Sequence, residues 1–216
     1  MTRFTLTRLL QQWIKKMKIL NLYAGVGGNR MYWGNDHEIT AVELNPSVAA
    51  CYKDLYPNDT VIVGDAHEYL LNHYKEFDFI WASPPCQSHS RTRAMCTWKG
   101  QNEPIYPDMK LWQEIIFLKH FHKCPYVIEN IKPYYKPFIA PTFELGGHFY
   151  WSNKIMLTPK QDAYRAHHTN MSELQAFKKI DLSGYKFTGI DKRQVLRNMV
   201  EPEEGKYIFE QLTKGN

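Results

Sequence analysis

The feature that most constrains the fold is an alternation of short apolar runs with segments of helical spacing. The apolar runs occupy residues 18–23, 38–43, 60–63, 77–81 and 125–128. Runs of four to six such residues are typical of buried strands, and strands joined by helices form a parallel sheet. We therefore predict an α/β fold, a mostly parallel sheet with helices on both faces.

Chemically useful residues follow several of these runs. A glycine-rich loop, residues 24–29, follows the first strand, Glu43 ends the second and Asp65 follows the third. Glu43 lies 18 residues beyond Gly25, close to the spacing of the acid that binds a ribose in dinucleotide-binding folds. Asp65 either caps the next helix or contacts a ligand. Because ligands bind at the carboxyl ends of parallel strands, we expect one binding edge.

The fourth strand leads into residues 82–88, ASPPCQS, where two prolines end the strand and stiffen its exit. The thiol of Cys86 at this strand tip is either a nucleophile or a small buried group. The local sequence around Cys86 leaves both interpretations open. Glu129 ends the next buried strand. A carboxylate is costly to bury there, so Glu129 is a candidate proton donor.

Charge is distributed unevenly along the 216 residues. Residues 1–18 hold five basic residues and no acid, leaving 22 basic and 22 acidic residues in the rest of the chain. The body is therefore not a uniformly basic nucleic-acid binder. The basic leading segment, residues 1–17, is a docking helix, an arm for nucleic acid or a membrane surface, or an extension ahead of a natural start at Met17. We assign it no function.

No apolar run approaches the roughly 20 residues of a membrane span, and the N-terminus is too polar for a signal peptide. The cysteines at positions 51, 86, 96 and 124 lack CxxC spacing, so we predict no metal site. The simplest interpretation is that these thiols are reduced, as in a cytosolic protein.

Several further elements follow from local patterns. Residues 87–99 are polar and basic without clear periodicity, and predict a mobile loop that either grips a phosphate backbone or is merely solvated. Residues 107–123 and 201–212 have the spacing of amphipathic helices. Gly205 either weakens the second helix or lets it pack closely against a neighbour. Residues 154–157 predict a further strand.

Four short motifs, in this order, resemble those of the cytosine-C5 DNA methyltransferase family. They are residues 23–28 (YAGVGG), 84–87 (PPCQ), 129–131 (ENI) and 197–202 (RNMVEP). The resemblance spans residues 19 to about 213, and the set is far more specific than any single motif.

This resemblance implies the Rossmann-like class I methyltransferase fold, with S-adenosyl-L-methionine as cofactor and a flipped-out cytosine of double-stranded DNA as substrate. It implies that Cys86 adds to C6 of cytosine and that Glu129 assists at N3. The cofactor-binding residues it implies are Tyr23, Ala24, Gly25, Gly27, Gly28, Glu43, Leu44, Asp65, Ala66, Asn198 and Val200. The substrate-binding residues that we predict with it are Pro85, Gln87, Ser88, Asn130, Arg91 and Arg93.

The chain departs from the family pattern in three places. The position of the family's Gln-x-Arg-x-Arg motif matches residues 148–153, which contain no arginine; the candidate substitutes are Arg91, Arg93, Arg165 and Arg193. Arg197 stands where the family has glycine. The target-recognition region, residues 154–196, is short. We accordingly predict a catalytic domain made of residues 18–153 and 197–213, with a reduced recognition region between them.

Three functions remain open at this point. The first is a small, phage-type cytosine-C5 DNA methyltransferase in the cytoplasm of a bacterium or a phage-infected host cell. The second is the same reaction on RNA, as in the tRNA methyltransferases that share these motifs. The third is a weakly active or inactive relative that binds DNA as an accessory. The sequence leaves the target site and the oligomeric state open.

Overall fold

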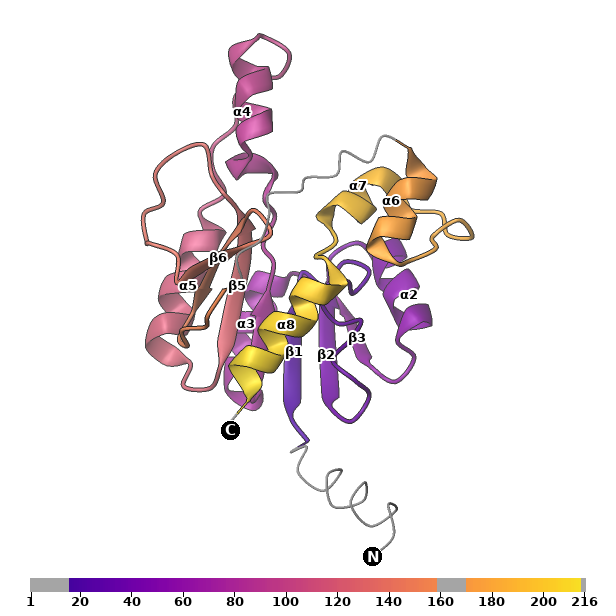
Figure 1. The fold of residues 1–216 in the computed structure, drawn as a ribbon, viewed down its shortest axis with the longest axis vertical. Coiled ribbons are helices and arrows are strands. Elements are labelled where there is room, and N and C mark those ends of the chain that lie inside the picture. The colour runs from indigo at the N-terminus through magenta and orange to yellow at the C-terminus, as the bar shows by residue number, and fades with distance from the viewer. Residues whose placement is uncertain (1–15, 159–169, 215–216) are drawn as a thin grey trace, which may run out of the picture.

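A computed structural model describes residues 16–158 and 170–214. Its centre is a seven-stranded sheet with the order β3-β2-β1-β4-β5-β7-β6 (Figure 1). The strands are β1 (Lys18–Leu22), β2 (Glu38–Glu43), β3 (Thr60–Val63), β4 (Phe79–Ala82), β5 (Tyr126–Ile131), β6 (Phe143–Leu145) and β7 (His148–Ser152).

The first five strands run parallel, and β6 and β7 are antiparallel to their neighbours. The chain moves outward from β1 through β2 to β3 and then returns to place β4 on the other side of β1. Such a reversal leaves a crevice outside the carboxyl ends of the two central strands. The predicted α/β fold with a mostly parallel sheet is therefore confirmed.

Helices surround the sheet (Figure 1). They are α2 (Pro46–Leu55), α3 (Ala66–His73), α4 (Arg91–Trp98), α5 (Lys110–Phe121), α6 (Met171–Lys178), α7 (Lys192–Asn198) and α8 (Pro202–Thr213), with short 3₁₀ turns η1 (Tyr74–Glu76) and η2 (Gln87–His89). Asn45 and Asp65 accept hydrogen bonds from the first amides of α2 and α3, so the sequence places both N-caps correctly.

Successive residues of the central strands face opposite sides of the sheet, and each side has its own core. On one side Leu20, Ile80 and Ile128 pack with α3 and α5. On the other side Ile19 and Phe79 pack with α8. Both faces are therefore covered, which explains why these strands are apolar throughout rather than alternating.

Helix α8 approaches the glycine-rich loop very closely. A Cβ atom at Gly205 would lie 2.5 Å from Cα and 2.6 Å from the backbone oxygen of Asn29. The structure thus decides between the two interpretations of Gly205: it lets this helix pack against a neighbour. The indole nitrogen of Trp33 also donates to the Gly205 oxygen at 3.3 Å.

Two local predictions were wrong. Residues 87–99 form η2 and the projecting helix α4 rather than a loop; Ser90 caps α4, and Ala94 is its buried residue, so no apolar stripe marked it. Residues 154–157 are not a strand. Strand β7 ends at Ser152, which is opposite Val127 near the start of β5, so the chain beyond it has no neighbouring strand to pair with.

The described part of residues 154–196 packs onto the body of the protein. Leu174 of α6 and Val195 of α7 share a core with Val26 and with Val48 of α2. The division into a catalytic domain and a recognition region stays a prediction. Residues 1–15 of the N-terminal extension lie outside the described residues. Within the described ranges, no helix has the length and apolarity needed to cross a membrane.

Candidate active site

A cavity of about 730 Å3 lies at the carboxyl ends of the central strands. Fourteen of the predicted site residues line it: Tyr23, Ala24, Gly25, Gly28, Glu43, Leu44, Asp65, Ala66, Pro85, Cys86, Gln87, Glu129, Asn198 and Val200. The predicted residues that are not among the lining are Gly27, Ser88, Asn130, Arg91 and Arg93. Tertiary structure thus brings together groups that are up to 177 positions apart in the sequence, from Tyr23 to Val200.

The glycine-rich loop has the backbone that its sequence predicts. Gly25 and Gly27 have φ angles of +56° and +78°, which side chains with a Cβ rarely adopt. A Cβ at Gly28 would lie 2.3 Å from the backbone oxygen of Val200, so this glycine lets the C-terminal motif close onto the loop. A Cβ at Gly25 would meet nothing within 4 Å, which leaves its backbone open to a ligand.

Glu43 holds the loop in place through backbone amides. One carboxylate oxygen accepts from the Gly25 amide at 3.0 Å and the other from the Asn45 amide at 2.9 Å. The next side chain, Leu44, is 69% exposed although it is apolar. An apolar side chain beside a fixed carboxylate suits a ligand that combines a flat ring with hydroxyl groups.

Asp65 is the N-cap of α3 and also lies at the cavity. It accepts hydrogen bonds from the His67 and Glu68 amides at the start of α3, and it is among the residues that line the cavity. The ammonium group of Lys110 lies 2.9 Å from its second oxygen. This ion pair lowers the pKa of Asp65, so the carboxyl group is charged at neutral pH.

Behind the loop lies a carboxylate that sequence reasoning missed. The side chain of Glu114 is 1% exposed; it accepts a hydrogen bond from the Tyr23 hydroxyl and lies 2.9 Å from Nδ1 of His67. Burial raises the pKa of Glu114, while Glu114 raises the pKa of His67. The signal was available, because Glu114 interrupts the buried stripe of α5.

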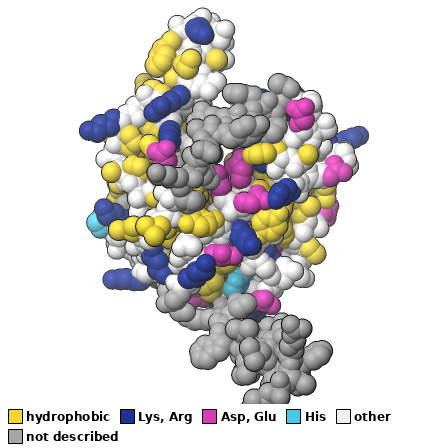
Figure 2. Space-filling view, viewed as in Figure 1, with side chains coloured by type: hydrophobic (Ala, Val, Ile, Leu, Met, Phe, Trp, Pro, Cys, Tyr) yellow, Lys and Arg dark blue, Asp and Glu magenta, His cyan; other side chains and the backbone are white. Residues whose placement is uncertain are grey.

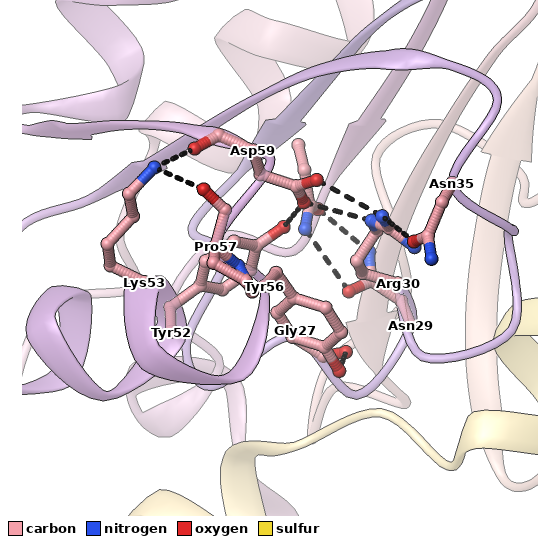
Figure 3. Close-up of polar contacts among 10 residues, drawn as sticks. Gly27, Asn29, Arg30, Asn35, Tyr52, Lys53, Tyr56, Pro57 and Asp59 are labelled. Atoms are coloured by element: carbon pink, nitrogen blue, oxygen red, sulfur yellow. Dashed lines mark hydrogen bonds and ion pairs between the residues drawn. The ribbon is translucent and has the colours of Figure 1, made fainter.

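A second buried network fixes the other side of the loop (Figure 3). Arg30 donates to Asp59 from Nε at 2.9 Å and from Nη2 at 3.1 Å, and the Tyr52 hydroxyl donates to Asp59 at 2.8 Å. The Tyr56 hydroxyl donates to the backbone oxygen of Gly27 at 2.9 Å. This network joins the glycine-rich loop to α2 and to the turn that follows it.

Cys86 sits on a rigid turn. The amide of Asn130 donates to the Pro84 oxygen at 2.9 Å, and the backbone amide of His89 donates to the Cys86 oxygen at 3.0 Å. Burial, and secondarily the charge of Glu129, raise the pKa of the Cys86 thiol to about 11. The thiol is therefore protonated at neutral pH and needs a proton acceptor before it can act as a nucleophile.

Glu129 extends from β5 into the same cavity. Its side chain is 12% exposed, and one carboxylate oxygen lies 3.6 Å from Nε2 of His148 on β7. His148 also lines the cavity; its place in the arginine-free segment, residues 148–153, was the one signal that could have identified it. One end of the cavity lies at strands β4, β5 and β7, away from β3, and it is lined by Cys86, Glu129 and His148.

The predicted arginines lie elsewhere. Arg91 donates to the Pro133 oxygen at 3.0 Å and Arg93 to the Glu103 oxygen at 3.2 Å, so both are held at the base of α4. Arg165 falls outside the described residues. The arginine that does line the cavity, among the described residues, is Arg197 at the end of α7.

The C-terminal motif is held at the cavity by a buried lysine from the segment predicted to be the recognition region. Lys178, in α6, donates to the Met199 oxygen and pairs with Glu201 at 2.8 Å. These contacts tie α6 to the C-terminal motif beside the cavity.

Comparison with known proteins identifies the family. The family model for C-5 cytosine-specific DNA methylase matches residues 17–135, more than half of the chain. This chain belongs to that family, and the family membership and the sheet order together confirm the predicted Rossmann-like methyltransferase fold. The family uses S-adenosyl-L-methionine, which confirms the cofactor prediction at the level of the family.

Individual relatives share less of the chain. A tRNA (cytosine(38)-C(5))-methyltransferase of Spodoptera frugiperda is 35% identical over 80 residues, which cover 34% of this chain and 24% of the relative. The chain thus spans about a quarter of that curated relative. Among solved structures, a DNMT2 mutant of Spodoptera frugiperda is 28% identical, with a TM-score of 0.40 and coverage of 53% and 35% of the two chains. A SAM-dependent methyltransferase of Agrobacterium tumefaciens is 14% identical, with a TM-score of 0.42 and coverage of 61% and 44%.

Proposed function

We propose that this protein transfers a methyl group from S-adenosyl-L-methionine to C5 of a cytosine in DNA. The observation that carries the proposal is one shared cavity. Cys86 and Glu129 line it together with the glycine-rich loop, Glu43 and Asp65. A nucleophile, an acid and a nucleoside-binding set of groups are therefore within reach of one another.

The residues of the cavity fit the cofactor. Its volume, about 730 Å3, is in the range of small-molecule sites and has room for more than one flat ring. The open backbone at Gly25 suits the amino-acid end, Glu43 suits the ribose hydroxyls, Leu44 suits the adenine face and Asp65 suits the adenine amine. The other groups that we assign to the cofactor are Tyr23, Ala24, Gly27, Gly28, Ala66, Asn198 and Val200.

When bound, the cofactor supplies an electrophilic methyl group, and the protein's task is to make C5 of cytosine nucleophilic. We assign this to Cys86, whose sulfur forms a bond to C6 and pushes electron density onto C5. The thiol must lose its proton as this bond forms. Glu129 faces it across the cavity and can take that proton, then donate it to N3 of the base.

This proton path suits the charges of the site. A thiolate and a carboxylate in one partly buried site repel each other, which is one reason that the pKa of Cys86 is raised. Moving the thiol proton to N3 through Glu129 neutralises the developing charge on the base. Pro85 and Gln87 line the cavity beside the thiol. Ser88 and Asn130 lie outside the lining and stabilise the Cys86 turn through hydrogen bonds.

The surface beside the cavity suits a nucleic acid. Helix α4 projects from the body next to the Cys86 turn, and Figure 2 shows apolar and basic side chains on this projection. Trp98 at its end is 72% exposed, and Arg91 is exposed at its start. Basic side chains with exposed aromatic rings bind the phosphate backbone and stack on unpaired bases. A cytosine must leave its helix to reach the thiol.

A second substrate is favoured by one specific observation. The curated relative that matches 34% of this chain is a tRNA (cytosine(38)-C(5))-methyltransferase. The same catalytic groups would serve cytosine in either nucleic acid, because the reacting base is identical. RNA is therefore the alternative substrate in every test below.

The test is transfer of tritium from labelled S-adenosyl-L-methionine to duplex DNA and to tRNA, in parallel. We expect transfer by the wild type and none by Cys86→Ser. Cys124→Ser is the matched control, since this free cysteine lies outside the cavity lining, and it should keep full activity. Transfer only to tRNA would replace DNA as the substrate. Cofactor binding without transfer to either would refute the catalytic proposal.

A further inference from the structure

The pair formed by Glu129 and His148 follows from strand register. In the antiparallel ladder of β5 and β7, Glu129 is opposite Tyr150 and Ile131 is opposite His148. Residues two apart on a strand share a face, so His148 is the diagonal neighbour of Glu129 on the cavity side. The imidazole Nε2 lies 3.6 Å from the carboxylate oxygen, and the side chains are 32% and 12% exposed.

This pair lies in a strongly acidic environment. Helix α8 brings Glu201 and Glu204 close to it, and the Tyr150 hydroxyl donates to Glu204 at 3.4 Å. Burial, then the charges of Glu201 and Glu129, raise the pKa of Glu204 to about 7, whereas a positive charge on His148 lowers it. The other groups facing this region are Cys86 on the β4 turn and Lys178 on α6, and Lys178 already pairs with Glu201.

Among the described residues, His148 is the group that lies within ion-pair distance of the Glu129 carboxyl oxygen. Lys178 pairs with Glu201, and Arg91 and Arg93 donate to backbone oxygens at the base of α4. Arg197 also lines the cavity, but the described ion pairs do not join it to Glu129. The ring nitrogen of His148 is therefore placed to stabilise the carboxylate that remains after Glu129 has given a proton to the base.

We propose that His148 is the positioning residue for Glu129 and holds one carboxyl oxygen in place while the other faces the base. This inference rests on the proposed methyl transfer and deepens it. Nε2 of His148 lies beside one oxygen of Glu129, at 3.6 Å, which leaves the other oxygen to hold the proton for N3. When that proton leaves, the imidazole stays beside the carboxylate and fixes its orientation.

The experiment measures kcat and KM for methyl transfer with the nucleic acid that the wild type accepts. His148→Gln should lower kcat by roughly ten- to a hundredfold with little change in KM, a smaller loss than that caused by removing the acid itself. In a Glu129→Gln background the same substitution should lower kcat almost no further, because His148 acts through Glu129.

His73→Gln is the matched control. His73 forms a surface pair with Glu76 at 2.8 Å on the far end of α3, so its loss should leave kcat and KM unchanged. An active wild type whose kcat is unaltered in His148→Gln, or equal losses from His148→Gln with and without Glu129, would overturn this inference alone. A wild type without transfer to any nucleic acid would overturn it together with the proposed function.

Discussion

The Arg30–Asp59 pair allows the sharpest test of how the glycine-rich loop is held in place. Both side chains are 3% exposed, and Asp59 accepts three hydrogen bonds, two from the guanidinium and one from Tyr52. Asp59→Asn keeps the size of the side chain and removes its charge, which leaves a buried guanidinium without its counter-ion. Removing one partner of a buried ion pair costs about 3–5 kcal/mol.

Asp59→Asn should lower the free energy of unfolding by about 3 kcal/mol. This value is at the lower end of the range for a broken buried ion pair, because the amide oxygen can still accept from Arg30. With a urea slope of roughly 1–3 kcal/mol per M, the unfolding midpoint falls by about 1–3 M. Asp54→Asn, which changes an exposed carboxylate near the end of α2, is the control and should stay within about 0.5 kcal/mol of the wild type. A loss below about 1 kcal/mol for Asp59→Asn would refute the reasoning.

Three further outcomes are expected. Gly28→Ala places a Cβ against backbone and should cost roughly 1–3 kcal/mol of unfolding free energy and weaken cofactor binding in calorimetry, whereas Gly64→Ala, whose Cβ would have an ordinary 4.0 Å contact, should change neither. Alkylation of Cys86 by iodoacetamide should be slow at pH 7 and accelerate up to about pH 11; a plateau near pH 8 would contradict the raised pKa. Glu114 raises the pKa of His67, so their pair stabilises the fold below about pH 6.5 and is lost as the pH rises through the raised value. His67→Asn should flatten that part of the stability profile, and an unchanged profile would exclude the pair as its cause.

The sequence predicted the central fold because its signals are local. Strands β1 to β5 are runs of apolar residues, and the caps at Asn45 and Asp65 are defined by a side chain and its next two or three amides. Helix α4 was not predicted because it lacks such a local signal. It projects from the body and buries one residue, Ala94, so it carries no apolar stripe that could reveal it.

The site was predictable in part. Residues that follow strands, such as Cys86 and Glu129, could be placed on one edge by topology alone. Their neighbours could not be predicted, because His148 comes from β7 and lies beside Glu129 only through strand register, and Glu204 comes from α8 and approaches only through helix packing. Glu114 was visible as a charge in an apolar stripe, but its contact with Tyr23 was not.

By itself the chain determined its strands, its main helices and the order of its reactive groups along a sheet edge, since these depend on neighbours a few positions away. Only the tertiary structure decided which groups face each other across the cavity and how acidic each one is. The physical reason is that ion pairing and burial act through space. Two residues 19 positions apart, Glu129 and His148, interact because two strands align, and no local pattern encodes that alignment.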